Sequence, residues 1–398
     1  MSSADKSTMA PRPATEARVL FDQIGRSDDC LLLGWVQTLI ESCVNYLRQR
    51  DIKKRAAACD RRIKEWASFP KSTPEITAYN AQRFDFDDQA LVEHLQEHGF
   101  VVVKGVADES DVEKAKTLLW QFLEERADMR RQEPATWTDH RFAAVGNPTN
   151  GIVSGNGFGH SEVSWFIRTL PNVKAIFSVI WRTDSLITSF DGGNVFRPFH
   201  APEHARHRTQ GGWWHVDQGH HKRGLHAVQG LVLLTDATVN TGGLCVVPGS
   251  HRQHAELLSY TVTSPDGSDY VAVPAPQINP SVRHGTLVCA RAGDAILWDS
   301  RLMHCNTPAL EPPSAALGYA ENELLRAAIY VCMTPRRFAD RATLALRRSA
   351  ALAGVGSSHW PHDFKPAADP SLLVPVDEAQ LEEAVRAGLM SREQWALI

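Results

Sequence analysis

The sequence predicts an α+β protein whose core is built from short β-strands and flanked by α-helices. Short apolar runs alternate with turn-forming segments between residues 227 and 333, a pattern that is typical of paired β-strands. Apolar residues recur at helical spacing in segments before and after this region. A His-x-Asp triplet, His215-Val216-Asp217, precedes the strand region, and His304 follows one of its runs. Strands that fold back on one another can bring these residues together.

The chain begins with two stretches that we expect to lie outside the strand region. Residues 1–16 are rich in Ser, Pro, Ala and Thr, which predicts a disordered leader. Residues 17–83 are predicted to be a helical extension, because apolar residues recur there at helical spacing. The same stretch turns basic between Arg48 and Lys64. We interpret these charges as the solvated face of a helix, although a basic helix can also bind calmodulin or an acidic membrane surface.

The strands and the remaining helices are expected to follow in order. The Gly242-Gly243 and Gly293-Asp294 pairs supply turns with little side-chain bulk. A helix is expected at residues 110–126, and residues 366–398 are expected to be a helical tail that packs on the body. Strands are expected at residues 227–234, 244–247, 286–289, 295–299 and 327–333.

The clearest indication of the protein's chemistry comes from three residues, His215, Asp217 and His304. Two imidazoles and one carboxylate can occupy one face of an octahedral iron(II), which leaves three adjacent positions for other ligands and oxygen. The triplet alone is not specific, because with 17 His in the chain it recurs at His160-Ser161-Glu162 and His254-Ala255-Glu256. Only His215-Val216-Asp217 is followed by strands and turns that can bring a second histidine close to it. His254 is interpreted as a solvated loop histidine, and His160 lies in a Gly-rich loop.

Arg326 stands directly before the last expected strand. A fixed guanidinium can bind a carboxylate through paired, charge-assisted hydrogen bonds. Together with the three metal-ligand candidates, it indicates an oxygen-activating iron enzyme that uses 2-oxoglutarate. A loop rich in Pro, Ser and Gly separates His304 from Arg326, so Arg301, Arg336 and Arg337 remain alternatives for the same role.

Two segments carry the metal-ligand candidates. Residues 214–251 end in GGLCVVPGSH, and residues 293–304 read GDAILWDSRLMH. Both resemble the phytanoyl-CoA dioxygenase family of iron(II)/2-oxoglutarate oxygenases. Residues 90–105 resemble the opening helix and first strand of that family, and residues 189–198 resemble the strand that enters its catalytic core.

The resemblance covers residues 84–365 and implies a fold as well as a set of roles. The implied fold is a double-stranded β-helix, a jelly-roll or cupin-like core, with flanking α-helices. His215, Asp217 and His304 would be the iron ligands. Arg326 would bind the distal carboxylate of 2-oxoglutarate.

Other polar residues are candidates for contacts with small molecules. Gln229, on the strand after the metal loop, and Asn306, which follows His304 closely, are candidates for contact with 2-oxoglutarate. The Gly-rich stretch at residues 154–159 lacks the features of a phosphate-binding loop and is interpreted as a loop near the mouth of the pocket. As candidates for the side of the pocket, Arg168, Arg197 and His160 indicate a polar or carboxylated small-molecule substrate. The substrate-binding candidates are His160, Trp165, Arg168 and Arg197.

The expected function is oxidation of a small-molecule metabolite by O2, with iron(II) as the metal and 2-oxoglutarate as co-substrate. Hydroxylation of an unactivated C–H bond is the expected outcome, with release of succinate and CO2. Asp217 argues against halogenation, because a halogenase of this class needs a small residue there to admit chloride. The alternative is a non-oxidative, cupin-like metal-binding protein that holds zinc or another divalent metal as a hydrolase, an isomerase or a binding module.

Bulk composition excludes several other classes of protein. A net charge of −4 and a pI of about 6.5 give no basic surface for nucleic acid. No apolar stretch approaches the roughly 20 residues that cross a bilayer, and the first residues lack the order of a secretion signal. Seven Cys at irregular spacing indicate reduced thiols. We therefore expect a soluble, cytoplasmic protein.

Overall fold

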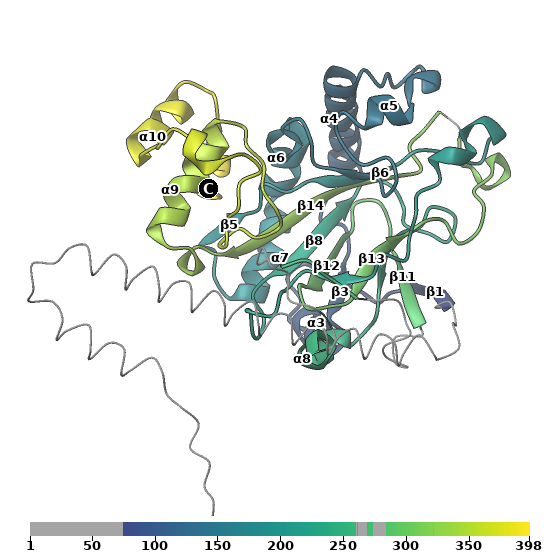
Figure 1. Ribbon diagram of the computed structural model, residues 1–398, viewed down its shortest axis with the longest axis horizontal. Coiled ribbons are helices and arrows are strands. Elements are labelled where there is room, and N and C mark those ends of the chain that lie inside the picture. The colour runs from purple at the N-terminus through teal and green to yellow at the C-terminus, as the bar shows by residue number, and fades with distance from the viewer. Residues whose placement is uncertain (1–74, 260, 262–268, 274–283, 321) are drawn as a thin grey trace, which may run out of the picture. The chain divides into compact units, whose positions relative to one another are not determined.

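The computed structural model describes residues 75–259, 261, 269–273, 284–320 and 322–398 (Figure 1). The leader predicted at residues 1–16 and most of the helical extension, up to residue 74, lie outside the described residues. Residues 75–83 were expected to complete that extension. They contribute instead to the sheets, because β1 (Glu75–Asn80) pairs in parallel with β11 (His284–Cys289) along its whole length.

Two β-sheets form the core (Figure 1). The smaller sheet has the order β1-β11-β9-β13-β7-β10, and the larger has the order β2-β3-β12-β8-β14-β6-β4, with β5 paired to β14. Along the chain, β8, β12 and β14 enter the larger sheet, whereas β9, β11 and β13 enter the smaller one. This alternation between two facing sheets is the double-stranded β-helix, and it confirms the predicted α+β class. The strands not yet given are β2 (Arg83–Phe84), β3 (Phe100–Val103), β4 (Ile152–Val153), β5 (Leu186–Thr188), β6 (Gly193–Phe196), β7 (His215–Val216), β8 (Val228–Leu233), β9 (Gly243–Val246), β10 (Val271–Ala272), β12 (Ala295–Asp299), β13 (His304–Thr307) and β14 (Arg326–Pro335).

Helices cover the outer face of the larger sheet. α6 and α7 contact β14, α4 packs on α6, and α3 lies against β3 and β12. Residues of α8 pack on the outer face of the smaller sheet. None of the described helices has the length and apolar character that a membrane span needs. The helices are α3 (Ala90–His98), α4 (Glu109–Ala127), α5 (Asp139–Phe142), α6 (Glu162–Thr169), α7 (Pro171–Trp181), α8 (His254–Ser259), α9 (Arg341–Leu352), α10 (Glu378–Arg386) and α11 (Arg392–Ala396).

Strands of the larger sheet are apolar on both faces because both faces are covered. In β3, Val101 and Val103 pack toward the helices, whereas Phe100 and Val102 pack between the two sheets. Apolar residues of β8 are divided between the same two cores. This double burial explains why the chain reads here as continuous apolar runs rather than as an alternation of polar and apolar residues.

Most expected elements form close to their predicted positions. The strands predicted at residues 227–234, 244–247, 295–299 and 327–333 are β8, β9, β12 and β14, and the helix predicted at residues 110–126 is α4. Asp108 begins α4 because its side chain accepts a hydrogen bond from the main-chain N–H of Asp111 at 2.8 Å. The strand predicted over residues 189–198 is wrong in extent. Within that range only Gly193–Phe196 forms a strand, β6, and the residues around Asp191 form a non-strand connection from β5.

The tail predicted at residues 366–398 contains α10 and α11. Its last two residues, Leu397 and Ile398, are buried in the core that the helices form with the larger sheet. The carbonyl of Leu397 accepts a hydrogen bond from the main-chain N–H of Thr188, in β5, at 2.9 Å. The end of the tail therefore packs on the body.

Candidate metal and co-substrate site

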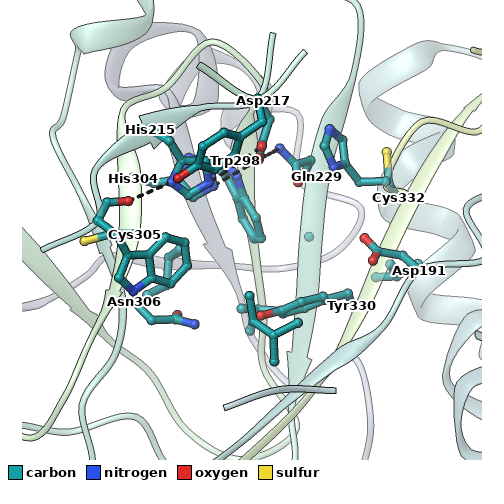
Figure 2. A pocket seen from close by; sticks show the side chains of 18 residues that line it. Asp191, His215, Asp217, Gln229, Trp298, His304, Cys305, Asn306, Tyr330 and Cys332 are labelled. Atoms are coloured by element: carbon teal, nitrogen blue, oxygen red, sulfur yellow. Dashed lines mark hydrogen bonds and ion pairs between the residues drawn. The ribbon is translucent and has the colours of Figure 1, made fainter. Parts of the chain in front are cut away.

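His215 and His304 lie opposite each other on neighbouring strands of the smaller sheet. β7 and β13 pair antiparallel, and these two histidines are partners in the register, with ring centroids 4.2 Å apart. Asp217 follows β7 directly, and its main-chain N–H donates to the carbonyl of Ser300 at 3.1 Å. Strand pairing thus brings together three side chains that are far apart in the sequence (Figure 2).

Each imidazole is oriented by its Nδ1 atom. Nδ1 lies 3.1 Å from the carbonyl oxygen of Trp213 in His215, and 2.9 Å from that of Leu302 in His304. Because a carbonyl only accepts hydrogen bonds, Nδ1 carries the proton and Nε2 keeps a free lone pair. The Nε2 atoms lie 3.6 Å (His215) and 3.2 Å (His304) from the carboxylate oxygens of Asp217. Ligands bonded to a metal at about 2.1 Å and at right angles are about 3.0 Å apart, so this donor set fits a divalent metal ion.

The charge states of Asp217 and His304 also suit a metal ion. Burial would raise the pKa of Asp217, but the neighbouring His359, His215 and His304 hold the pKa of that carboxyl well below its usual value. Burial lowers the pKa of His304. A carboxylate beside neutral imidazoles is the form that binds metals. The Nε2 atom of Gln229 donates to Oδ2 of Asp217 at 2.8 Å, so this residue orients the carboxylate.

Arg326 is completely buried, but only one of its nitrogens has a partner among the described residues. Its Nε atom donates to Oδ1 of Asn194 at 2.9 Å. Neither terminal nitrogen has a hydrogen-bond partner in the part of the chain that the structure describes. Burial lowers the pKa of Arg326 to about 10, so the guanidinium remains charged at neutral pH. A carboxylate can accept hydrogen bonds from both of these buried, unpartnered nitrogens as a bidentate pair.

Arg326 shares a face of β14 with residues that line a cavity. Side chains alternate along a strand, so Arg326 lies on the same face as Ala328, Tyr330 and Cys332. Ala328 packs in the core between the sheets, and Tyr330 and Cys332 line the cavity. Gly243 on β9 leaves room for the guanidinium, because a Cβ atom at this position would overlap Nη1 of Arg326.

The cavity next to the three metal-ligand candidates has a volume of about 220 Å³. His215, Asp217 and His304 line one side of it (Figure 2). Aromatic side chains, among them Trp298 and Tyr330, form much of the remaining wall. The cavity therefore combines a donor set for a metal with a largely apolar enclosure, the usual character of a small-molecule site.

Asn306 and Gln229, the two further candidates for contact with 2-oxoglutarate, both line this cavity. Tyr330 also lines the cavity and lies on the same face of β14 as Arg326. Burial raises the pKa of Tyr330 to about 12, although the side chain of Asn306 helps to lower it, so the hydroxyl keeps its proton at neutral pH. Tyr330 was not among the predicted site residues, although its spacing from Arg326 on one strand could have identified it.

The four substrate-binding candidates do not line the cavity. Arg168 donates to two main-chain carbonyls, and Arg197 donates to the carbonyl of Trp137 and to the carboxylate of Asp139. Both arginines are buried and already bonded.

His160 and Trp165 both pack against the ring of Phe190. The imidazole Nε2 of His160 lies 3.0 Å from the carbonyl of Val355. Three of the four candidates miss the cavity because α6 and the turn before it pack against α4, on the outer side of the larger sheet.

The alternative arginines are also bonded elsewhere. Arg301 forms two hydrogen bonds to the carboxylate of Asp299, at 2.9 and 2.6 Å. Arg336 donates to the carbonyl of Ala396, and Arg337 lies over the ring of Phe338. Of the four arginines considered for the co-substrate, Arg326 alone has its terminal nitrogens buried and without partners.

The interpretation of His254 as a solvated loop residue is wrong. His254 is buried at the start of α8, and its Nε2 atom lies 2.8 Å from the carbonyl oxygen of Gln218. The polar residues around it suggested solvent exposure. The apolar side chains of α8 instead pack on the smaller sheet, and His254, at the start of the same helix, is buried with them.

A second group of metal-ligand types, His221, Asp269 and Asp363, lies outside the cavity. The ammonium of Lys222 bonds to the carboxylates of both Asp269 and Asp363. Because a buried cation already occupies the position between these carboxylates, this group is an ion-pair cluster rather than a metal site.

Comparison with known proteins places the chain in a family. The family model described as phytanoyl-CoA dioxygenase matches residues 95–308, more than half of the chain. The Ava biosynthesis cluster protein O of Aspergillus versicolor is 26% identical over a match of 216 residues that covers 52% of this chain and 65% of that protein. The match thus spans slightly less than two thirds of the length of this relative.

Solved structures with weaker similarity include two enzymes. The carbocyclase SnoK from nogalamycin biosynthesis is 17% identical, with a TM-score of 0.40, over 62% of this chain and 83% of that chain. EctD from S. alaskensis, solved with 2-oxoglutarate and 5-hydroxyectoine, is 16% identical, with a TM-score of 0.42, over 67% of this chain and 82% of that chain. By the match of the family model over residues 95–308, the chain belongs to the phytanoyl-CoA dioxygenase family.

Proposed function

We propose that this protein is an iron(II)- and 2-oxoglutarate-dependent dioxygenase that oxidises a C–H bond of a small molecule. The observation that carries this proposal is the buried guanidinium of Arg326, with two unpartnered nitrogens on the strand face that borders the cavity. A protein that only held a metal would have no use for these N–H groups, whose burial is costly. A bound dicarboxylate would satisfy them.

His215, Asp217 and His304 would hold the iron, and Arg326 would hold the distal carboxylate of 2-oxoglutarate. Bound iron and 2-oxoglutarate together supply the oxidising chemistry with O2, and succinate and CO2 are released. We propose hydroxylation of an unactivated C–H bond as the outcome. The protein's part is to fix the geometry, which its hydrogen bonds already do.

The surrounding residues have supporting roles in this proposal. The carbonyls of Trp213 and Leu302 keep both Nε2 lone pairs directed at the metal position. Gln229 holds the Asp217 carboxylate through its amide, so it would tune the metal rather than contact the co-substrate. Tyr330 and Asn306 can donate hydrogen bonds to oxygen atoms of 2-oxoglutarate. The apolar walls of the cavity would limit access of water.

A polar small molecule is the proposed substrate class. The curated relative carries a name that places it in a biosynthesis cluster, which supports a small-molecule substrate. The carboxylated alternative depended on Arg168 and Arg197, and both donate their hydrogen bonds elsewhere. We propose a reducing, cytoplasmic compartment, because the described cysteines Cys245, Cys289, Cys305 and Cys332 are free thiols.

The test is an anaerobic titration followed by visible spectroscopy. Iron(II) and then 2-oxoglutarate are added to the full-length protein, and a weak charge-transfer band is expected only when both are present. Asp217→Ala should lose the band because it removes a metal ligand, whereas Asp363→Ala, in the ion-pair cluster outside the cavity, should keep it. Metal binding without any band on addition of 2-oxoglutarate would favour the non-oxidative metal protein.

A further inference from the structure

Asp191 is an acidic group in the cavity that neither the metal nor the co-substrate needs. It belongs to the segment between β5 and β6 and lines the same cavity as His215 and His304. Figure 2 shows its carboxylate across the cavity from His304, with the oxygen atoms directed inward. A group in this position faces whatever molecule occupies the space beside the metal.

In the part of the chain that the structure describes, no cationic side chain forms a hydrogen bond with the carboxylate of Asp191, although Arg168 and His359 lie close enough to stabilise its charge. Its Oδ1 atom accepts a hydrogen bond from the main-chain N–H of Gly192 at 2.6 Å. Arg168, the neighbouring guanidinium, donates to the main-chain carbonyl of Asp191 and not to its carboxylate. No side chain in the described part of the chain donates a hydrogen bond to this carboxylate.

Burying the charged carboxylate of Asp191 costs free energy, and a bound ligand can reduce this cost. Burial raises the pKa of Asp191, and His359, the hydrogen bond from Gly192 and Arg168 oppose that shift only in part. Burying a carboxylate without a cation costs free energy, which a bound cation recovers. The cavity thus favours ligands that bring a positive charge to Asp191.

The charges of the proposed metal site strengthen this preference. Divalent iron and the guanidinium of Arg326 together balance the carboxylate of Asp217 and the two carboxylates of 2-oxoglutarate. Once both are bound, Asp191 is the cavity-lining carboxylate that still accepts no charge-assisted hydrogen bond, because the neighbouring Arg168 donates to its main-chain carbonyl instead. A cationic substrate would complete the balance.

Two further features describe the rest of such a ligand. The Nε2 atom of His359, a residue that lines the cavity, is buried and has no hydrogen-bond partner in the described structure. Trp213, Trp298 and Tyr330 contribute aromatic surface to the walls. Aromatic faces attract both apolar groups and ammonium ions.

We propose that Asp191 and His359 form the substrate subsite, and that the substrate carries a protonated amine on an apolar body. The amine donates to the carboxylate of Asp191, His359 bonds to a neighbouring polar group, and the apolar body lies against the aromatic walls. This assignment deepens the proposed function and rests on it, because it takes the metal side of the cavity for iron and 2-oxoglutarate. Asp191 is here a residue that determines specificity.

The test uses three probes that share a ring and differ in charge: benzylamine, benzyl alcohol and benzoate. Each is titrated by calorimetry into the full-length protein loaded with zinc(II) and 2-oxoglutarate, which cannot turn over. Benzylamine should bind roughly tenfold more tightly than the other two, as expected for a charge-assisted pair that is partly shielded from water. Asp191→Asn should abolish the preference, because the amide keeps the bond from Gly192 but carries no charge.

A matched variant and a second readout separate the possible failures. Asp139→Asn makes the same chemical change outside the cavity and should keep the preference for benzylamine. The affinity of Asp191→Asn for 2-oxoglutarate should stay within about twofold of the wild type, since Asp191 has no role in binding it. Equal binding of the probes, a preference for benzoate, or an amine preference that survives Asp191→Asn would overturn the subsite with 2-oxoglutarate still bound. Loss of 2-oxoglutarate binding in the wild type would instead overturn the proposed function.

Discussion

Arg326 and Arg347 are both completely buried, but the two guanidiniums have very different surroundings. Every nitrogen of Arg347 donates to a main-chain carbonyl, and its partners are Thr188, Pro361, Leu397 and Ile398. Arg326 has one partner, the side chain of Asn194, and two terminal nitrogens without any in the described structure. Burial lowers the pKa of both, to about 9 for Arg347 and about 10 for Arg326.

The difference shows how a structural arginine can be told from one that awaits a ligand. Arg347 joins α9 to β5 and to the end of the C-terminal tail, so its bonds support the fold. Arg326 donates one hydrogen bond within the described structure, so its two terminal nitrogens remain available to a ligand. Burial alone does not distinguish the two residues. The number of satisfied N–H groups does.

The largest effect on stability is expected from Arg347→Met. The substitution leaves buried carbonyls without donors, and we expect the free energy of unfolding to fall by about 3–5 kcal/mol. Urea denaturation followed by circular dichroism measures this loss. A fall below about 1 kcal/mol would show that these bonds contribute little and would remove the contrast with Arg326.

The substitution Gln229→Leu tests whether a hydrogen bond to the metal-ligand candidate Asp217 supports metal binding. Because the amide of Gln229 holds Oδ2 of Asp217, its removal should weaken iron(II) binding by roughly 10- to 100-fold. Competition with a colorimetric chelator under anaerobic conditions measures the affinity. Gln121→Leu, an exposed change on α4, is the control and should bind iron normally. Unchanged affinity in Gln229→Leu would mean that the carboxylate does not need this support.

Asn194→Ala tests whether the single partner of Arg326 positions it. Loss of the bond to Nε should weaken 2-oxoglutarate binding by about tenfold, which corresponds to about 1.4 kcal/mol. Iron affinity should not change, and it serves as the internal control in the same titration. An equal loss of iron and 2-oxoglutarate affinity would point to general damage rather than to positioning.

The smallest expected effect is a dependence of stability on pH. Burial lowers the pKa of His160 to about 4, whereas an unfolded histidine titrates near 6.5. Between these values the unfolded chain binds a proton that the folded chain does not, so stability should fall as pH drops from about 6.5 toward 4. His160→Gln should make the plot of urea midpoint against pH less steep over this range. An unchanged slope would contradict the assignment.

The sequence contained enough information for the fold and for the three metal-ligand candidates. Apolar runs and Gly-containing turns predicted β8, β9, β12 and β14, because strands buried on both faces cannot contain many polar residues. The proximity of His215 and His304 follows from the pairing of β7 and β13. Arg326 was predicted from its place at the start of a strand, and its unpartnered nitrogens are visible only in the structure.

Residues on irregular segments could not be placed in this way. Asp191 lies in a short connection between strands and His359 in a segment after α9, and neither position has a periodicity that predicts where a side chain points. Arg168 was assigned to the substrate from its place after a Gly-rich loop. The packing of α6 on α4 turns it instead toward main-chain carbonyls, a tertiary effect that local sequence does not encode.

The most direct test of the account is the affinity of Arg326→Met for 2-oxoglutarate in the presence of iron(II), measured anaerobically. The account predicts at least a 100-fold loss of 2-oxoglutarate affinity, about 2.7 kcal/mol, since a buried bidentate pair is removed. Iron should still bind, and the unfolding free energy should not fall, in contrast to Arg347→Met. Normal 2-oxoglutarate affinity in Arg326→Met with iron bound would contradict the central claim.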